Sequence, residues 1–347
     1  MSSTSIRYEI YPQMKLYDNM DSGGFSPYAM LSGPKNYRSK QINTDSLGFR
    51  KSLNTNIEYS VSQIKHYDKI NFLVGGSTVF GVGSTSDATT ISSNLSKASK
   101  EIWLNFGIRG ANSFQELIHL INILNKANKI GKVVFLSGIN DLYMSLINNE
   151  LSDFDNGFGT KFNKIGSYHP YHQSFAIFFS NLYNKDLNSM IKRRKLNMLF
   201  SFFSSEKPST NILNFNKRVE VFLNIYSRNF KLYRGLKESF KIDQISFILQ
   251  PLFDWTNKET SSNEFQVLNY LNNLQRDSPW VKFKNSLKNP KLKQKISREI
   301  KSFAARENIR FLNSNEFFVN LKDDCFVDSV HLNDTGNRVI TDKILKL

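Results

Sequence analysis

The sequence predicts an α/β fold of three layers, in which helices cover both faces of a mostly parallel, five-stranded sheet. Short apolar runs without polar alternation recur along the chain, as in strands that are buried on both faces. Segments with a helical period lie between these runs, which is typical of parallel sheets. Small or polar residues follow several of the runs, at the sheet edge where such folds bind ligands.

The predicted strands begin near residue 70. They cover residues 70–74, 102–106, 132–137, 245–250 and 309–312. A helix is expected over residues 113–128 because its apolar side chains fall on one stripe. The stripe consists of Leu117, Leu120, Ile121 and Leu124. Further helices are expected over residues 212–240, 291–306 and 335–345.

Two segments do not fit this alternation. Residues 1–65 are rich in Tyr, Asn, Ser and Gly, with turn signals between Met20 and Pro34, and we expect an irregular extension that packs on the main domain. The main domain then covers residues 66–347. Residues 150–211 show no clear period and are too numerous for one loop, which indicates an insertion. The insertion forms either a lid over the ligand edge or a contact with a partner.

The chain is basic, with 46 Lys and Arg against 30 Asp and Glu and a formal charge of +16. Such a charge raises the question of a nucleic-acid or anionic partner. The lysines are scattered, however, and only Lys192–Lys195 form a tight run. With no RNA-recognition or zinc-finger signature, a solvated basic surface is favoured over a nucleic-acid partner. A protein that uses this charge to bind nucleic acid or a membrane surface stays open as an alternative.

No run of about 18 apolar residues is present, so no membrane-spanning helix is expected. The N-terminal residues contain no apolar core of a signal peptide, and a cytoplasmic location is therefore predicted. The oligomeric state is not predicted. Cys325 is the single cysteine, which excludes an intramolecular disulfide and a zinc site made of cysteines. His169 and His172 form at most a weak metal-binding pattern, and we expect no metal or organic cofactor.

The residues after the strands suggest one chemistry. Ser77 follows the first strand, and a serine hydroxyl needs a base before it becomes a nucleophile. His331 can be that base, and Asp328, three residues earlier, can orient its imidazole. The attack creates an oxyanion, which the N–H groups of Ser77 and Gly110 and the side-chain amide of Asn140 can bind.

Four short blocks carry these residues in a recognisable order. They are Gly75-Gly-Ser-Thr78, Asn105-Phe-Gly-Ile-Arg-Gly110, Gly138-Ile-Asn-Asp141 and Asp328-Ser-Val-His331. Together they resemble the SGNH (GDSL-type) hydrolase family. The resemblance implies a flavodoxin-like α/β/α sandwich, Ser77, Asp328 and His331 as catalytic residues, and an oxyanion hole of Ser77, Gly110 and Asn140. Gly76 departs from the family's pattern, because an aspartate is common at this position, and what compensates for it is not predicted.

Two stretches narrow the expected substrate. Gly75–Thr78 and Asn43–Arg50 resemble segments of bacterial family members associated with surface polysaccharides. The resemblance implies a serine esterase that removes an acyl group, such as acetyl, from a sugar, glycan or nucleotide sugar, which can be anionic. An O-acyltransferase that uses the same serine, and a catalytically idle glycan-binding module, stay open as alternatives.

Three further residues near these blocks have competing interpretations. Arg109 either contacts an anionic substrate or forms a surface ion pair. Asp141 is expected to cap a helix over residues 142–147. Cys325 is expected to be an inert thiol, because no second base accompanies it.

Overall fold

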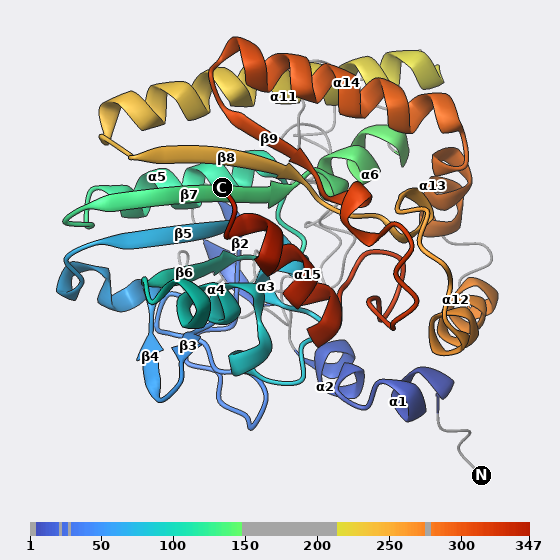
Figure 1. The fold of residues 1–347 in the computed structure, drawn as a ribbon, viewed down its shortest axis with the longest axis horizontal. Coiled ribbons are helices and arrows are strands. Elements are labelled where there is room, and N and C mark those ends of the chain that lie inside the picture. Colours follow the sequence, from blue (N-terminus) through green and yellow to red (C-terminus); the bar gives the residue numbers. More distant parts are fainter. Residues whose placement is uncertain (1–4, 21–22, 27–28, 148–213, 275–278) are drawn as a thin grey trace, which may run out of the picture.

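A sheet of five parallel strands forms the centre of the protein (Figure 1). The computed structural model describes residues 5–20, 23–26, 29–147, 214–274 and 279–347. From one edge to the other the strands are β6 (Trp103–Gly107), β5 (Ile70–Gly75), β7 (Ile130–Ser137), β8 (Gln244–Leu249) and β9 (Arg310–Asn313). All five lie within two residues of their predicted positions.

Side chains of each strand alternate between the two faces of the sheet, and each face has its own apolar core. In β5, Phe72 and Val74 belong to one core, whereas Leu73 belongs to the other. The first core contains residues of α5 (Ser113–Leu124), α11 (Phe215–Ser239) and α14 (Pro290–Arg306). The second contains residues of α4 (Ile91–Ser99) and α15 (Asp334–Ile344). The predicted three-layer α/β/α fold is therefore confirmed.

The helices differ from the prediction in detail. Helix α5 ends at Leu124, and Ile121 of the predicted apolar stripe is 42% exposed, while Ile123 is buried instead. The sequence did not indicate α4, α12 (Ser262–Leu274) or α13 (Pro279–Leu287). Their apolar faces are short and interrupted by polar residues, so packing stabilises them more than their own period does.

The N-terminal residues contain short regular elements rather than a wholly irregular chain. They are α1 (Ile6–Ile10), α2 (Met14–Asn19), the antiparallel pairs β1 (Gly24–Ser26) with β2 (Met30–Ser32) and β3 (Ser52–Asn54) with β4 (Ile57–Tyr59), and the 3-10 helix η1 (Val61–His66). Met14 and Tyr17 are buried in a small core with Phe80 and Val82, which follow β5. Figure 1 shows α1 beside α12, with α2 next to α1. The boundary at residue 65 stays a prediction.

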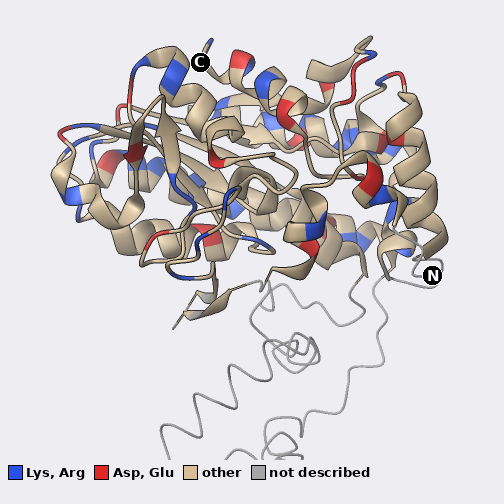
Figure 2. Ribbon diagram, turned by 90° about the horizontal axis from the view of Figure 1, so that it is seen from below, with Lys and Arg blue, Asp and Glu red and all other residues tan. Residues whose placement is uncertain are grey.

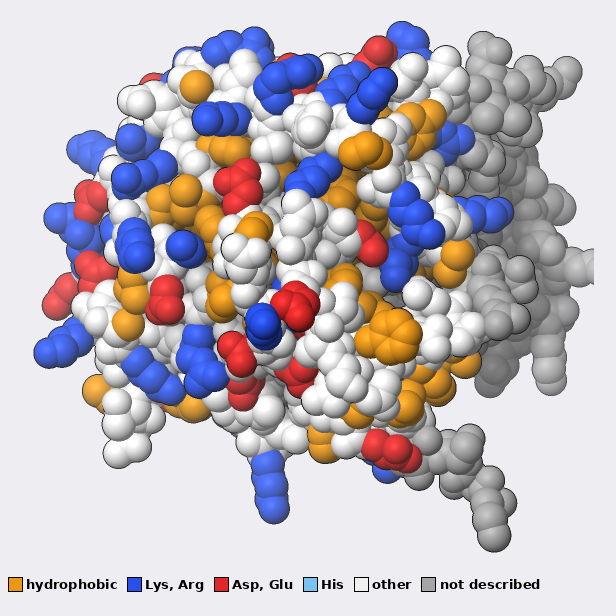
Figure 3. All heavy atoms as spheres, turned by 45° about the vertical axis from the view of Figure 1, so that its right-hand side comes forward, with side chains coloured by type: hydrophobic (Ala, Val, Ile, Leu, Met, Phe, Trp, Pro, Cys, Tyr) orange, Lys and Arg blue, Asp and Glu red, His pale blue; other side chains and the backbone are white. Residues whose placement is uncertain are grey.

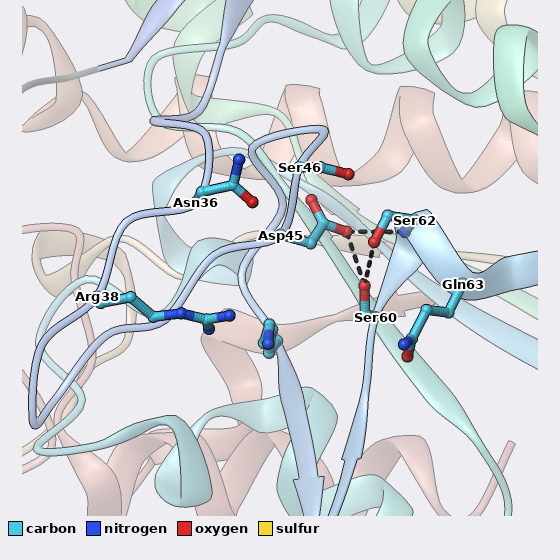
Figure 4. A pocket seen from close by; sticks show the side chains of 8 residues that line it. Asn36, Arg38, Asp45, Ser46, Ser60, Ser62 and Gln63 are labelled. Atoms are coloured by element: carbon cyan, nitrogen blue, oxygen red, sulfur yellow. Dashed lines mark hydrogen bonds between the residues drawn. The ribbon is translucent and has the colours of Figure 1, made fainter.

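The buried carboxylate of Asp45 holds the segment Asn43–Arg50 in place. Asp45 accepts hydrogen bonds from the N–H groups of Leu47 and Phe49 on one oxygen and from Ser60 Oγ and Ser62 N on the other. Figure 4 shows Asp45 directed at both serines, on the wall of an open polar hollow of about 220 Å³. The hollow is lined by N-terminal residues and by none of the predicted catalytic residues.

The surface charge is dispersed. Figure 2 shows Lys and Arg spread over many elements, and on the face in Figure 3 basic side chains alternate with acidic and apolar ones. In the part of the chain that is described, no helix is both long and apolar enough to cross a membrane. The predicted insertion at residues 150–211, with Lys192–Lys195, His169 and His172, lies outside the described residues.

Candidate active site

Ser77 is the first residue of the short helix α3 (Ser77–Phe80), which follows directly on β5. Strand β5 lies between β6 and β7, so the chain order of the strands reverses at this point. In open parallel sheets such a reversal opens a crevice at the carboxyl ends of the strands, where ligands bind. The fold therefore presents the half-buried Ser77 at the edge where a ligand is expected.

Ser77, His331 and Asp328 form a continuous chain of hydrogen bonds. His331 Nε2 lies 2.8 Å from Ser77 Oγ, and His331 Nδ1 lies 2.8 Å from Asp328 Oδ2. Because an ionised carboxylate only accepts, Nδ1 carries the hydrogen, and Nε2 is left to accept from the serine hydroxyl. Residues 254 positions apart thus meet in the arrangement that activates a nucleophile.

The loop before α15 fixes the acid and the base. Asp328 Oδ1 accepts hydrogen bonds from Val330 N and His331 N, each at 2.9 Å. Thr78, next to Ser77, donates from Oγ1 to the Val330 carbonyl at 3.2 Å. The histidine loop and the serine helix are therefore joined by the Thr78 hydroxyl as well as by their reacting side chains.

The Asp328 carboxylate is ionised by its surroundings. Burial alone would raise its pKa, but the charge and hydrogen bond of His331, and then the charge of Arg7, outweigh burial. The pKa of Asp328 therefore lies well below its ordinary value. Arg7 Nη2 donates to Asp328 Oδ2 at 3.0 Å. Arg7 is the site residue that sequence reasoning missed, because α1 has no motif and lies 321 positions away.

The three candidate oxyanion donors come from the start of α3, from the loop after β6 and from α6. The Ser77 N–H is in the first turn of α3, where no helical carbonyl can accept it. Gly110 has a φ of +76°, a conformation that favours glycine, and is exposed. Neither N–H donates to an acceptor among the described residues. Asn140, in α6 (Ile139–Ile147), donates from Nδ2 to the Ala111 carbonyl at 2.6 Å, which leaves its second amide hydrogen for a ligand.

The structure explains why Gly76 carries no side chain. A Cβ atom on Gly76 would lie 2.9 Å from Asn140 Nδ2, closer than such atoms normally approach. The same Cβ would face the carbonyls of Ala111 and Ile108 at 3.6 and 3.9 Å. The aspartate that is common at this position would therefore displace Asn140, and the turn before Ser77 is held by neighbouring backbone instead.

Two nearby predictions need correction or refinement. Asp141 does not cap a helix over residues 142–147, because α6 already begins at Ile139. Its carboxylate accepts from Ser113 N and Oγ, at the start of α5, so it holds a neighbouring helix. Arg109 donates from Nη2 to the Tyr17 carbonyl of α2 at 3.0 Å. Its contact with substrate stays a prediction.

Cys325 is buried, and burial raises the pKa of its thiol to about 12. A thiol in that state is a poor nucleophile, which agrees with an inert side chain. The backbone N–H groups of Cys325 and Phe326 donate to Glu264, which in turn pairs with the buried Lys258. Within the described residues, no group of three or more His, Cys, Asp or Glu side chains could hold a metal ion.

No protein-family model and no curated protein matches the sequence. Three of the similar solved structures are esterases that act on acetylated carbohydrate. An acetyl xylan esterase has 12% identity and a TM-score of 0.38, over 80% of this chain and 98% of its own. A catalytic mutant of an acetylxylan esterase from Geobacillus stearothermophilus has 14% identity and a TM-score of 0.36, over 80% of this chain and 93% of its own. A carbohydrate acetylesterase from Sinorhizobium meliloti has 11% identity and a TM-score of 0.37, over 80% of this chain and 99% of its own.

At identities of 11–14% and TM-scores of 0.36–0.38, the similarity carries no argument about the activity of this chain. What the protein does has to be argued from its own residues.

Proposed function

We propose that the protein is a serine esterase of the SGNH type, in which Ser77, His331 and Asp328 are the catalytic residues. The observation that carries the proposal is the hydrogen-bond chain from Ser77 Oγ through both ring nitrogens of His331 to Asp328. The Ser77–His331 contact of 2.8 Å is short enough for proton transfer, and the His331–Asp328 contact of 2.8 Å orients the ring. A serine whose only role was to form a turn would not be expected to face a histidine that is hydrogen-bonded to a carboxylate.

The reaction follows from this geometry. Ser77 Oγ attacks the carbonyl carbon of the ester while His331 Nε2 takes its proton, and Asp328 stabilises the imidazolium that forms. The N–H groups of Ser77 and Gly110 and the amide of Asn140 bind the oxyanion. The imidazolium then gives its proton to the leaving alcohol, which departs and leaves an acyl-serine. A water molecule, deprotonated by His331, attacks the acyl-serine and releases the acid.

The proposed substrate is an acetyl or other acyl ester on a sugar, glycan or nucleotide sugar. Support for it comes from the resemblance of Gly75–Thr78 and Asn43–Arg50 to segments of polysaccharide-associated family members. Arg109, in the block that carries Gly110, is proposed as a contact for an anionic part of that substrate. Transfer of the acyl group to a sugar hydroxyl uses the same first half of the reaction, and the product balance distinguishes transfer from hydrolysis.

The proposal is tested with a generic acetyl ester and a fluorophosphonate probe. Ser77→Ala should lose turnover by about 10⁴-fold or more, as loss of a catalytic serine does, and should lose the label. Ser286→Ala, at a serine of α13 that is half-buried like Ser77, is the matched control, and Cys325→Ala tests the thiol. Both should retain activity and labelling.

Equal turnover by Ser77→Ala and the parent protein would exclude the mechanism. A parent protein that neither turns over acyl esters nor takes the label, yet binds glycan, would be a binding module. Free acetate as product supports hydrolysis, whereas an acetylated sugar without free acetate identifies a transferase.

A further inference from the structure

Arg7 joins the N-terminal helix α1 to the carboxylate of the catalytic chain. Its guanidinium donates from Nη2 to Asp328 Oδ2 at 3.0 Å and from Nη1 to Asp18 Oδ2, in α2, at 2.8 Å. The side chain of Arg7 is only 12% exposed, and that of Asp328 14%. Arg7 and Asp328 are therefore largely withdrawn from solvent, and their charges interact more strongly than on the surface, whereas the side chain of Asp18 is 31% exposed.

The contact is made to the oxygen that matters for catalysis. Asp328 Oδ2 also accepts the hydrogen bond from His331 Nδ1 at 2.8 Å, so Arg7 and His331 share one acceptor atom. The other oxygen, Oδ1, is occupied by two backbone N–H groups. A donor on the shared oxygen draws negative charge away from the imidazole and limits how far the carboxylate can rotate.

The segment that delivers Arg7 is fastened to the loop after the serine helix. The Tyr17 hydroxyl donates to the backbone carbonyl of Gly81 at 2.7 Å and lies 2.9 Å from a second acceptor, the carbonyl of Ser84. Gln13 donates from Nε2 to the Gly83 carbonyl at 3.0 Å. The segment that carries Arg7 is thus anchored to residues 81–84, which directly follow the serine helix α3.

Structural stability alone does not explain an arginine at this position. Arg7 Nε is buried without a hydrogen-bond partner among the described residues, which is unfavourable for folding. An arginine that served only to hold α1 in place would be replaced at little cost by an apolar side chain of similar size. Its remaining bonds go to two carboxylates, and one of them belongs to the catalytic chain.

We propose that Arg7 is a positioning residue that sets the pH range in which His331 acts as a base, through the carboxylate oxygen that both share. The inference rests on the proposed esterase function. Without the positive charge of Arg7, Asp328 would favour the imidazolium more strongly, and His331 would remain protonated up to a higher pH. Removing the negative charge of Asp18 would act in the opposite direction.

Other charged groups face this cluster and have to be kept constant. Tyr8 lies next to Arg7 and Asp18 within the same N-terminal helices. Lys284, on α13, interacts electrostatically with Asp328 and with Asp254. Single substitutions at Arg7 and Asp18 leave Tyr8, Lys284 and Asp254 unchanged. The sign of each shift in the pH profile can therefore be assigned to the substituted charge.

The test compares pH profiles of kcat/KM for the full-length parent protein with those of Arg7→Gln, Arg7→Lys and Asp18→Asn. Arg7→Gln should move the acid limb upward by about 0.5–1 pH unit, as expected for loss of one partly buried charge. Arg7→Lys should stay closer to the parent profile than Arg7→Gln does. Asp18→Asn should move the acid limb downward by a few tenths of a pH unit. Arg38→Gln, at an exposed arginine outside the site, is the matched control and should change nothing.

A second measurement does not depend on activity. The ring signals of His331 in NMR spectra, assigned by their loss in His331→Gln, should show the same shifts of the titration midpoint. Opposite shifts in Arg7→Gln and Asp18→Asn support the proposal, because a general loss of structure would not produce opposite signs. Coinciding His331 titrations in the parent, Arg7→Gln and Asp18→Asn overturn it.

The two proposals fail in different ways. A protein without esterase activity whose His331 midpoint still shifts as described would refute the proposed function and keep the coupling of Arg7 to His331. An active esterase with unchanged profiles in all variants would keep the function and refute the role of Arg7. If Arg7→Gln does not fold, the Asp18→Asn and Arg7→Lys titrations decide.

Discussion

The space beside Ser77 is shared between Gly76 and Asn140. A Cβ atom at Gly76 would lie 2.9 Å from Asn140 Nδ2, and Asn140 is the side chain proposed to bind the oxyanion. Asn140 is itself held by the Ala111 carbonyl at 2.6 Å, so it has little freedom to move aside. A single methyl group at Gly76 is therefore expected to affect the reaction more than the fold.

Gly76→Ala should lower kcat by about 10- to 100-fold, because a misplacement of a catalytic donor by up to 1 Å costs about that much. The midpoint of thermal unfolding should fall by only a few degrees. Gly235→Ala, in α11, is the matched control, because a Cβ there meets nothing within 4 Å. An active Gly76→Ala variant with unchanged kcat would show that Asn140 does not need its present place.

Helix α3 is very short, and its position depends on a side chain from the N-terminal segment. Arg50 is fully buried and donates to the carbonyls of Phe80 and Gly81, at 3.2 and 2.9 Å, where α3 ends. Its Nε is paired with Asp87 at 2.6 Å, and Nη1 also donates to the Tyr17 hydroxyl. The Asn43–Arg50 block is therefore a structural support of the serine helix, whatever its value as a mark of substrate class.

Arg50→Met should lower the free energy of unfolding by about 3–5 kcal/mol, because it leaves the Asp87 carboxylate buried without its cation. Arg50→Lys should not restore the parent value, since one ammonium group cannot reach all the acceptors of a guanidinium. Urea unfolding measures both, with Arg38→Met as the exposed control. A loss below about 1 kcal/mol, as for a surface pair, would contradict this role of Arg50.

The protein as a whole contains a pair of buried acids, Glu116 in α5 and Asp141 in α6, the helix that also carries Asn140. Glu116 of α5 accepts from Ser137 Oγ at 2.9 Å, while its Oε2 is buried without a partner among the described residues. Burial, and then the charge of Asp141, raise the pKa of Glu116 well above its ordinary value. Burial likewise raises the pKa of Asp141, although hydrogen bonds from Ser113 and Tyr226 oppose it.

A raised pKa in the folded protein means that the folded state binds the proton more tightly than the unfolded state. Stability is therefore complete below the ordinary pKa of a glutamate and falls as the pH rises toward the folded value. Glu116→Gln removes the titration and keeps the shape. It should raise the free energy of unfolding by about 1–3 kcal/mol more at pH 8 than at pH 5.

Urea unfolding at both pH values measures this difference. Glu238→Gln, at a glutamate whose side chain is 70% exposed, is the control and should show no such dependence. If the free energy of unfolding of Glu116→Gln changed with pH in the same way as that of the parent, Glu116 would be equally easy to ionise in the folded and unfolded states.

The sequence by itself determined the strands, their parallel arrangement and the order of the four site blocks. Apolar runs can be recognised locally because a strand buried on both faces has no polar alternation. Ser77, Asp328 and His331 could be chosen because few residue types can serve as nucleophile, base and acid, and because each follows a predicted element. The sequence could not indicate α4, α12 and α13, whose apolar residues are diluted by polar ones and whose stability comes from packing.

Only the tertiary structure decided which side chains support that site. Arg7 reaches Asp328 across 321 positions, and no local pattern predicts a contact between segments so far apart. Gly76 could not be explained until Asn140 was placed, because the reason for a missing side chain is the space that another residue fills. Periodicity and residue chemistry are properties of a segment, whereas shared oxygens and excluded volume arise only when segments meet.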